Sequence, residues 1–146
     1  MTTIAVSRSL RMMVSDSSAT IGTSRAPDCP KMWRTKNCIV GISGDILAGE
    51  NFVRWLSTRK GPRPKGGYNA LLLYRDGRIS WFYSRHREQF IDRDYYAIGS
   101  GTDYAIGSLG ALAEMGLAID PRIAVRVACQ HDVMSKEPLL TLRWLK

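Results

Sequence analysis

The order in which strand-like and helix-like segments follow one another constrains the fold of this chain most strongly. Short stretches rich in Val, Ile and Met come first, and the first helical pattern begins only after residue 44. Two strand-like stretches, a third short one, two helical patterns and a closing strand follow. This order predicts an α+β layer fold in which helices cover the outer faces of sheets.

Turn residues set the bounds of the expected strands. Asp76 and Gly77 form the turn pair that is typical of a β-hairpin, and the small polar stretch 16–24 predicts a loop. The expected strands cover residues 3–8, 10–15, 31–34, 38–42, 68–74, 79–83, 96–98 and 139–144.

Three helices are expected from apolar residues at helical spacing. The first covers about residues 45–57 and is ended by the Gly- and Pro-rich stretch 59–67. The second lies over 105–115 and ends at Gly116. Asp120 and Pro121 form an N-cap and first-turn pair for the third helix.

Length and cysteine usage favour a single domain over residues 1–146. A chain of this size buries roughly 68–70% of its unfolded surface, so its core needs no disulfide or metal. Cys29, Cys38 and Cys129 lack CxxC spacing and are expected to be free thiols. Apolar runs are too short for a membrane span, and the start lacks a signal-peptide core, so we expect a cytoplasmic protein.

The charge of the chain raises nucleic acid as a candidate partner. The net charge is +8 and the isoelectric point is near 9.8. The basic residues are spread along the sequence, however, and the one dense cluster, at 59–65, is typical of a solvated loop. A module that binds nucleic acid through Arg59, Lys60, Arg63 and Lys65 is therefore a disfavoured alternative. Four tryptophans among mainly apolar neighbours are expected to be core anchors: Trp33, Trp55, Trp81 and Trp144.

Thr2 directly follows the initiator methionine. If Met1 is removed, Thr2 has a hydroxyl and a free α-amine on the same residue. Such an amine has an ordinary pKa of about 7.7–8 and is able to accept the hydroxyl's proton, which gives an activated nucleophile without a metal. A retained Met1 would turn the amine into an amide and abolish its basicity.

Several short motifs occur together in one order. The set comprises Thr2-Thr3-Ile4-Ala5-Val6, Val14-Ser15-Asp16-Ser17, Ala19-Thr20-x-Gly22, Lys31, Gly41-Ile-Ser-Gly44, Ala97-Ile-Gly-Ser100-Gly101 and Asp132-x-x-Ser135. Each motif is weak, but the set in register resembles the proteasome β-subunit family, and within it the bacterial HslV-type peptidases. The match covers both ends and the middle of the chain and is weakest between residues 59 and 93.

The resemblance implies an N-terminal-nucleophile hydrolase fold, a four-layer αββα sandwich that cleaves peptide bonds. Thr2 would be the nucleophile and its amine the general base. Lys31 matches the catalytic lysine, which lowers the pKa of the threonine groups, and Asp16 matches the carboxylate that holds this lysine. The backbone N–H of Gly44 would face the oxyanion.

Further matched positions support the second half of the reaction and substrate binding. Ser100 and Asp132 match residues that bind the N-terminal amine and position water, and Ser135 matches a support in the same network. Residues that line the first specificity pocket or pair with the substrate backbone are matched by Ala19, Thr20, Ile42 and Ile46. An apolar pocket would favour apolar residues before the cleaved bond.

The resemblance also implies partners. They are a peptide or unfolded-protein substrate and further copies of the chain in a homo-oligomeric ring, with no cofactor and no metal. An AAA+ unfoldase partner is left open, because only residues 45–57 are expected to be helical where the family has two long helices. The outer helix layer is thus expected to be reduced, which would suit the compact genome of a bacteriophage or mobile element.

Alternatives remain for the chain and for its residues. The pairs Gly44-Asp45 and Lys136-Glu137 depart from the glycines usual in the family, and a proteasome-like scaffold subunit without catalysis is the second hypothesis. Asp16 alone would suit a turn, Lys31 a strand edge and Ser100 a helix entrance. His131, beside Asp132, is interpreted as structural.

Overall fold

The computed structural model describes residues 2–17, 20–21, 24–25, 30–83 and 85–145. It contains two large antiparallel sheets and three helices. The first sheet has the order β10-β1-β2-β11, formed by β10 (Tyr95–Gly99), β1 (Thr3–Ser7), β2 (Met12–Ser15) and β11 (Leu140–Arg143). The second has the order β5-β6-β7-β8-β9, formed by β5 (Met32–Arg34), β6 (Cys38–Gly44), β7 (Tyr68–Tyr74), β8 (Ile79–Tyr83) and β9 (Gln89–Ile91). A separate two-stranded pair joins β3 (Thr20–Ile21) to β4 (Ser24–Arg25).

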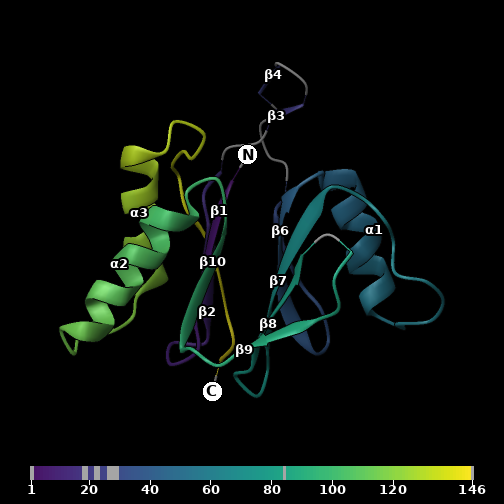
Figure 1. Cartoon of the computed structure of the whole chain (residues 1–146), viewed down its shortest axis with the longest axis horizontal. Helices are drawn as coiled ribbons and strands as arrows, with labels where there is room; N and C mark the ends of the chain where they lie inside the picture. Colours follow the sequence, from purple (N-terminus) through teal and green to yellow (C-terminus); the bar gives the residue numbers. More distant parts are fainter. Residues whose placement is uncertain (1, 18–19, 22–23, 26–29, 84, 146) are drawn as a thin grey trace.

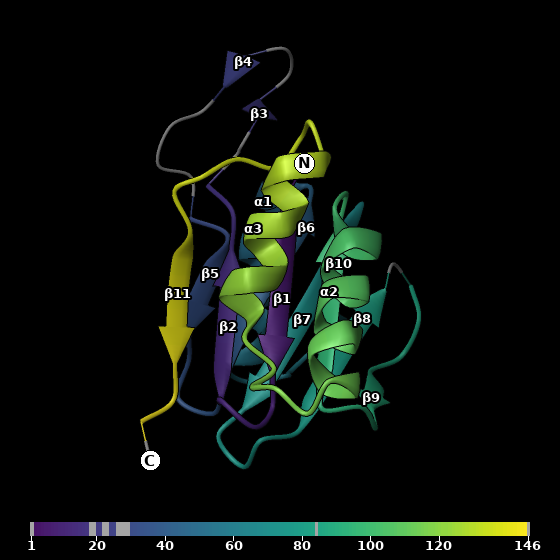
Figure 2. The same ribbon diagram turned by 90° about the vertical axis from the view of Figure 1, so that its left-hand side faces the viewer.

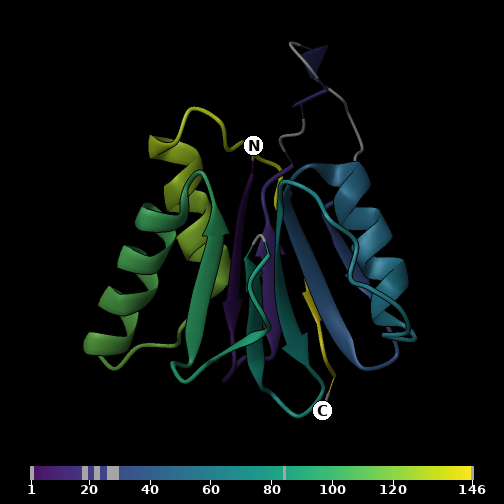
Figure 3. The ribbon, with the colours of Figure 1, turned by 45° about the vertical axis from the view of Figure 1, so that its right-hand side comes forward.

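The elements stack as four layers. Figure 1 shows the two sheets in the middle, with α2 (Thr102–Glu114) and α3 (Pro121–His131) on one side and α1 (Ile46–Leu56) on the other. Turned by 90°, α3 lies over β1 and β2, and α2 lies over β10 (Figure 2). The oblique view in Figure 3 shows α1 alone against the outer face of the second sheet. The αββα sandwich implied by the resemblance is confirmed.

The two sheets pack face to face through a shared apolar core. Alternate residues of each strand face inward, so Ile4 of β1 meets Leu71 of β7 in one buried cluster. Gly41 of β6 faces Ile4 and Met13 of the first sheet across this core. A Cβ atom at Gly41 would fall 2.8 Å from Ile4 and 3.0 Å from Met13, so glycine permits this packing.

Two further cores bind the helices to the sheets. The opposite faces of β1 and β2 pack against α2 and α3, with Ala105 and Val125 fully buried. On the other side, Phe52 of α1 is fully buried against β6 and β7, and its ring lies 4.9 Å from that of Phe82. Three stacked cores therefore separate the four layers.

The helix ends follow the sequence signals. The side chain of Asp45 accepts a hydrogen bond from the backbone N–H of Ala48, and that of Asp120 accepts one from Arg122. Gly116 follows α2 at a φ of 68°. All three helices lie where they were expected. None of the described helices is long and apolar enough to cross a membrane.

The strands agree with expectation less evenly. The hairpin β7–β8 has the predicted bounds, whereas β1, β2, β5 and β11 are shorter than expected. The stretch 16–24 was predicted as a loop, but β3 begins within it, and β9 was not predicted at all. Cys38 and Cys129 are free thiols, as expected, and Cys29 lies outside the described residues. The four tryptophans are buried or pack against the core, as expected.

Candidate active site

Thr2, Lys31 and Asp16 meet at the end of the first sheet. The Nζ atom of Lys31 donates hydrogen bonds to Thr2 Oγ1 at 2.7 Å and to Asp16 Oδ1 at 3.0 Å. The hydroxyl of Thr2 donates to the same carboxylate oxygen of Asp16. Thr2 is 3% exposed, Lys31 is 1% exposed and Asp16 is fully buried at 0%. A cation and a carboxylate of opposite charge are thus held out of water against one hydroxyl.

The strands themselves place these three side chains. Thr2 immediately precedes β1 and Asp16 immediately follows β2, and β1 pairs with β2 so that Ile4 lies opposite Ser15. Lys31 precedes β5 of the other sheet, and its carbonyl oxygen accepts a hydrogen bond from Ile42 of β6 at 2.8 Å. The cluster therefore bridges both sheets, with two residues from one and the cation from the other.

A second hydrogen-bonded group gathers around Asp132. Ser100 and Ser135 each donate a hydrogen bond to Asp132 Oδ2 at 2.6 Å. Ser100 follows β10, and Asp132 caps the C-terminal end of α3. Ser135 sits one turn further on and is 2% exposed. All three residues predicted as supports are brought together.

Thr3 joins the two groups, although it was not among the predicted site residues. Its backbone N–H donates to Asp16 Oδ1 at 2.9 Å, and its hydroxyl lies 2.6 Å from that of Ser135. The backbone N–H of Gly101 also donates to this hydroxyl, at 3.1 Å. The sequence did contain a signal for Thr3. It stands at the start of an apolar strand, where its hydroxyl would be buried and would need a hydrogen-bond partner.

Backbone groups complete the environment of the carboxylates. The N–H of Lys136 donates to Asp16 Oδ2 at 3.0 Å, so this departure from the family pattern contributes through its main chain. Burial alone would raise the pKa of Asp132, but hydrogen bonds from Ser100 and Ser135 outweigh it and lower the pKa. Asp132 is therefore held as a carboxylate, a hydrogen-bond acceptor.

Cys129 of α3 lies near the same charges. Its burial raises the pKa of the thiol to about 11, and the negative charge of Asp16 adds to this shift. The thiol is thus kept protonated at neutral pH and is a poor nucleophile.

The remaining predicted residues lie apart from the hydrogen-bonded cluster. Gly44 is exposed at the end of β6 with a φ of 95°, and a Cβ there would lie 2.3 Å from the carbonyl oxygen of Gly67. Ile46 is half-buried against the core beneath α1. The side chain of Ile42 is fully buried in that core, and its role in lining the pocket or pairing with the substrate backbone stays a prediction. Ala19 lies outside the described residues, and for Thr20 only the backbone, in β3, is described.

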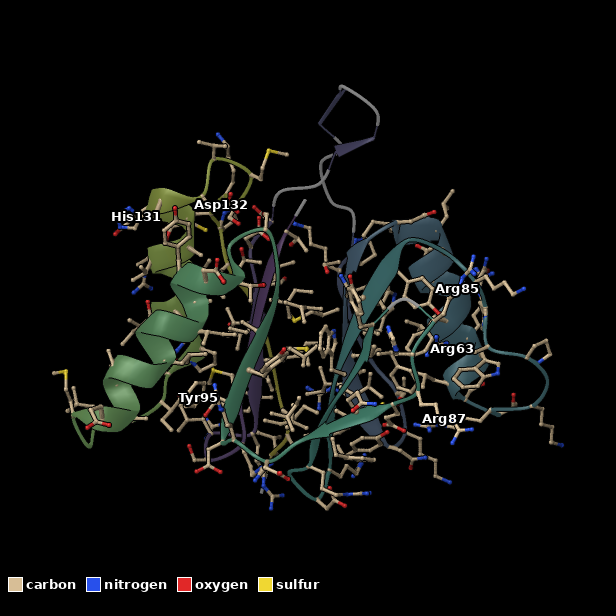
Figure 4. All side chains as sticks on the ribbon, viewed as in Figure 1. Arg63, Arg85, Arg87, Tyr95, His131 and Asp132 are labelled. Carbon is tan, nitrogen blue, oxygen red and sulfur yellow. The ribbon has the colours of Figure 1, made fainter. Side chains whose placement is uncertain are left out.

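His131 takes no part in the cluster. Its ring stacks on that of Tyr104 at 5.4 Å on the exposed side of α3, and Figure 4 shows it at the end of the helix beside Asp132. Among the described residues, no group of three or more His, Cys, Asp and Glu side chains is placed to hold a metal ion.

Comparison with known proteins finds solved structures that share this fold. No protein-family model and no curated protein matches the chain by sequence. Among solved structures, BPH of Thiobacillus denitrificans in complex with epoxomicin matches with a TM-score of 0.70 and 18% identity over 96% of each chain. Eukaryotic HslV from Trypanosoma brucei matches with a TM-score of 0.66 and 20% identity, over 97% of this chain and 99% of that one. The chain has the fold of proteasome-type N-terminal nucleophile hydrolases.

A third structure with the proteasome-type fold shows that the likeness extends beyond these two proteins. An Anbu (Gly-1) mutant from Hyphomicrobium sp. strain MC1 matches with a TM-score of 0.74 and 15% identity, over 99% of this chain and 81% of that one. The expected reduction of the outer layer is confirmed within this fold, because the described chain between β6 and β7 holds α1 as its one helix.

Proposed function

We propose that the chain is a threonine endopeptidase that cleaves peptide bonds with the hydroxyl of Thr2 once Met1 has been removed. The observation that carries the proposal is the buried contact of Thr2 Oγ1 with Lys31 and Asp16. A buried lysine is costly unless it is paired. Here the pair also places the ammonium on the one hydroxyl that would neighbour a free α-amine after removal of Met1.

The first half of the proposed reaction forms an ester. The free α-amine of Thr2 takes the proton from Oγ1 as this oxygen attacks the carbonyl carbon of the substrate. The tetrahedral intermediate then collapses, the C–N bond breaks, and the leaving amine takes the proton from the α-amine. The substrate's acyl group stays on Thr2 as an ester.

The second half restores the enzyme. Water attacks the ester carbonyl while the α-amine accepts a proton from it. The ester's C–O bond then breaks and the α-ammonium returns this proton to Oγ1, which releases a carboxylic acid and restores Thr2. We assign Ser100, Asp132 and Ser135 to hold the amine and this water, since the two serines already donate to one carboxylate oxygen. The N–H of Gly44 is assigned to the oxyanion, where one donor is worth roughly 2.7–4 kcal/mol.

Lys31 and Asp16 set the reactivity of the hydroxyl. An ammonium 2.7 Å from Oγ1 stabilises the negative charge that develops there during attack. Asp16 fixes the ammonium through the ion pair at 3.0 Å. The backbone N–H groups of Thr3 and Lys136 hold that carboxylate in turn. The site is preorganised, so little rearrangement is needed at the moment of reaction.

Substrates and assembly belong to the same proposal. We assign an extended peptide with an apolar residue before the cleaved bond, with Thr20 and Ile46 near the binding strand. A homo-oligomeric ring of copies of this chain is part of the proposal, because the resemblance to HslV-type peptidases implies one. Mass photometry of the purified protein tests the ring, and a monomer at micromolar concentration contradicts it.

The decisive experiment begins with the intact mass of the purified protein. The proposal expects a mass without Met1, hydrolysis of fluorogenic peptides, and one covalent adduct with epoxomicin, an inhibitor bound in one of the matched structures. Thr2→Ser should keep turnover and the adduct, whereas Thr2→Ala should lose both. Thr141→Ala, on the exposed strand β11, is the matched control.

Two results would oppose the proposal in different ways. Turnover by Thr2→Ala equal to that of the parent protein excludes Thr2 as the nucleophile. Retention of Met1 with no turnover and no adduct favours the second hypothesis, a scaffold subunit without catalysis.

A further inference from the structure

A basic cavity lies on the α1 side of the molecule, away from the Thr2 cluster. Its volume is about 710 Å³, within the range of about 300–1,000 Å³ that is typical of small-molecule sites. Its lining comes from the end of α1, the segment after it, β8 and the loop after β8: Trp55, Arg59, Arg63, Pro64, Lys65, Gly66, Phe82, Arg85, His86, Arg87 and Glu88. None of these residues belongs to the proposed catalytic cluster, and Figure 4 shows Arg63, Arg85 and Arg87 on the opposite side of the sandwich from Asp132.

Positive charge dominates the lining. Five lysine and arginine side chains face the cavity, against one carboxylate, Glu88. Glu88 is already engaged, because its Oε2 atom pairs with Arg59 at 3.0 Å. Among the described residues, no side chain or backbone group makes a hydrogen bond or an ion pair with the side chains of Lys65, Arg85 or Arg87. The like charges of Lys65, Arg85 and Arg87 repel each other, and no described residue compensates these three.

Two of the arginines are held in fixed positions. Arg59 donates to the Tyr74 hydroxyl at 2.7 Å, and its guanidinium lies 6.0 Å from the ring centre of Phe82. Arg63 donates to the carbonyl of His86 at 2.6 Å and lies 5.3 Å from the same ring. This last bond ties the segment after α1 to the loop after β8. The two walls of the cavity are therefore fastened together by arginines.

Arg59 adopts a backbone conformation that arginine seldom occupies. Its φ is 51°, in the left-handed region, where glycine is the usual residue. A glycine at this position would end α1 equally well and without strain. The arginine therefore adds only its side chain. If this residue only had to end the helix, glycine would be favoured. The arginine therefore indicates that its fixed guanidinium has a further role.

We propose that this cavity is a binding site for a small, multiply phosphorylated molecule of about nucleotide size. Guanidinium groups bind phosphate oxygens through paired hydrogen bonds. A compact anion with several charges matches the uncompensated cations better than a single carboxylate does. The aromatic rings of Trp55 and Phe82 lie under the guanidinium of Arg59 and help to fix it. Because the rings hold the arginine, we assign ligand recognition mainly to the phosphate groups. The proposal is independent of the chemistry of Thr2.

Calorimetric titration of the full chain tests the site, with tripolyphosphate and ATP as separate probes. Binding of either probe, weaker at high salt, is expected. The double variant Arg85→Gln/Arg87→Gln should weaken it about tenfold or more, since hydrogen bonds between charged groups are lost. Arg93→Gln/Arg143→Gln removes the same charge from residues that do not line the cavity, and should bind as the parent protein does.

Three outcomes overturn the proposal. One is the absence of binding by both probes in the parent protein at low salt. Another is an equal loss of affinity in the two double variants, which would mean that total charge alone attracts the anion. The third is binding of a single-stranded DNA oligonucleotide or a polyglutamate peptide as tightly as ATP, with the same response to Arg85→Gln/Arg87→Gln. Circular dichroism of each variant confirms that it is folded.

Discussion

The ammonium nitrogen of Lys31 lies 2.7 Å from the hydroxyl oxygen of Thr2, and water reaches neither side chain to any useful extent. Burying an ammonium is unfavourable unless a carboxylate and further hydrogen bonds compensate it. Asp16 provides that compensation here and is itself fully buried. The cluster is therefore a place where stability and reactivity are linked, and single substitutions in it should change both.

Comparing Lys31→Met with the double variant Lys31→Met/Asp16→Asn should separate the effect of the cluster on stability from its effect on reactivity. The single variant leaves a buried carboxylate without its cation and should lower the free energy of unfolding by about 3–5 kcal/mol. The double variant removes both charges and should recover much of that loss. Peptide hydrolysis should fall by about a hundredfold or more in both variants, because neither has the cation beside Oγ1. Urea unfolding and turnover of a fluorogenic peptide are the two measurements.

The contrary outcome for this pair of variants is specific. A double variant no more stable than Lys31→Met would show that packing of the lysine stem, and not the unpaired charge, accounts for the loss. Turnover retained in Lys31→Met would exclude a catalytic role for the ammonium.

Gly99→Ala should disturb the site through the backbone of Thr2. Gly99 has a φ of 102°, and a Cβ there would lie 1.7 Å from the carbonyl oxygen of Thr2. Both the left-handed conformation and the clash oppose alanine, so the free energy of unfolding should fall by about 2–4 kcal/mol. Peptide turnover by the folded fraction should also fall steeply, since Thr2 must move. Thermal unfolding and turnover per folded molecule are the readouts.

Gly116→Ala is the matched control for Gly99→Ala. Gly116 has a φ of 68°, but nothing lies within 4 Å of a Cβ at this position. It should lose only the cost of the left-handed conformation, about 1–2 kcal/mol, with turnover unchanged. Equal effects of the two substitutions on turnover would show that the contact with Thr2 is unimportant.

Local signals in the sequence were sufficient for most of the elements. Asp120 and Pro121 fix the start of α3, and Asp76 and Gly77 fix the β7–β8 turn, because these residues act on their immediate neighbours. β9 was not predicted from the sequence. Phe90 at its centre is apolar yet 51% exposed, so this edge strand lacks the alternation of buried apolar and exposed polar residues that marks a strand. Its pairing with β8 depends on tertiary context.

The two candidate sites differ in how far the sequence could foresee them. Thr2, Asp16 and Lys31 were predicted by resemblance to a family, not by spacing, because 29 positions separate the hydroxyl from the ammonium. The basic cavity had no such guide. Arg63 meets His86 across 23 positions, and only the fold shows that the cluster at 59–65, expected as a solvated loop, faces a second set of cations.

Trp144 should be the main anchor of the C-terminal strand. It is 5% exposed, and its indole N–H donates to the carbonyl of Leu73 at 3.0 Å. Arg75 lies over its ring at 4.5 Å. Trp144→Ala should cost about 3–5 kcal/mol through the cavity it leaves. Trp144→Phe keeps most of the apolar contact and should cost about 1–3 kcal/mol, from the lost hydrogen bond to Leu73 and the smaller ring. Urea denaturation decides, and equal losses in both variants would contradict the packing argument.

Glu88 links β8 and β9 to Arg59 through a small, partly exposed network. Its carboxylate accepts hydrogen bonds from Tyr74 and Ser80 and pairs with Arg59. Burial alone would raise the pKa of Glu88, but these hydrogen bonds outweigh it and lower the pKa below the ordinary 4.5. Burial also raises the pKa of Tyr74 to about 12 from 10.0. The two shifts act at opposite ends of the pH range.

Stability should therefore fall at both extremes, for separate reasons. A carboxyl with a lowered pKa contributes stability that is fully present above its unfolded pKa, near 4.5, and is lost as pH falls through the folded value. A phenol with a raised pKa stabilises the fold below 10.0 and ceases to do so as pH rises to about 12. Glu88→Gln should flatten the acid limb, and Tyr74→Phe the alkaline limb, in chemical unfolding measured from pH 3 to pH 11. An acid limb as steep in Glu88→Gln as in the parent protein would show that other carboxylates govern acid unfolding.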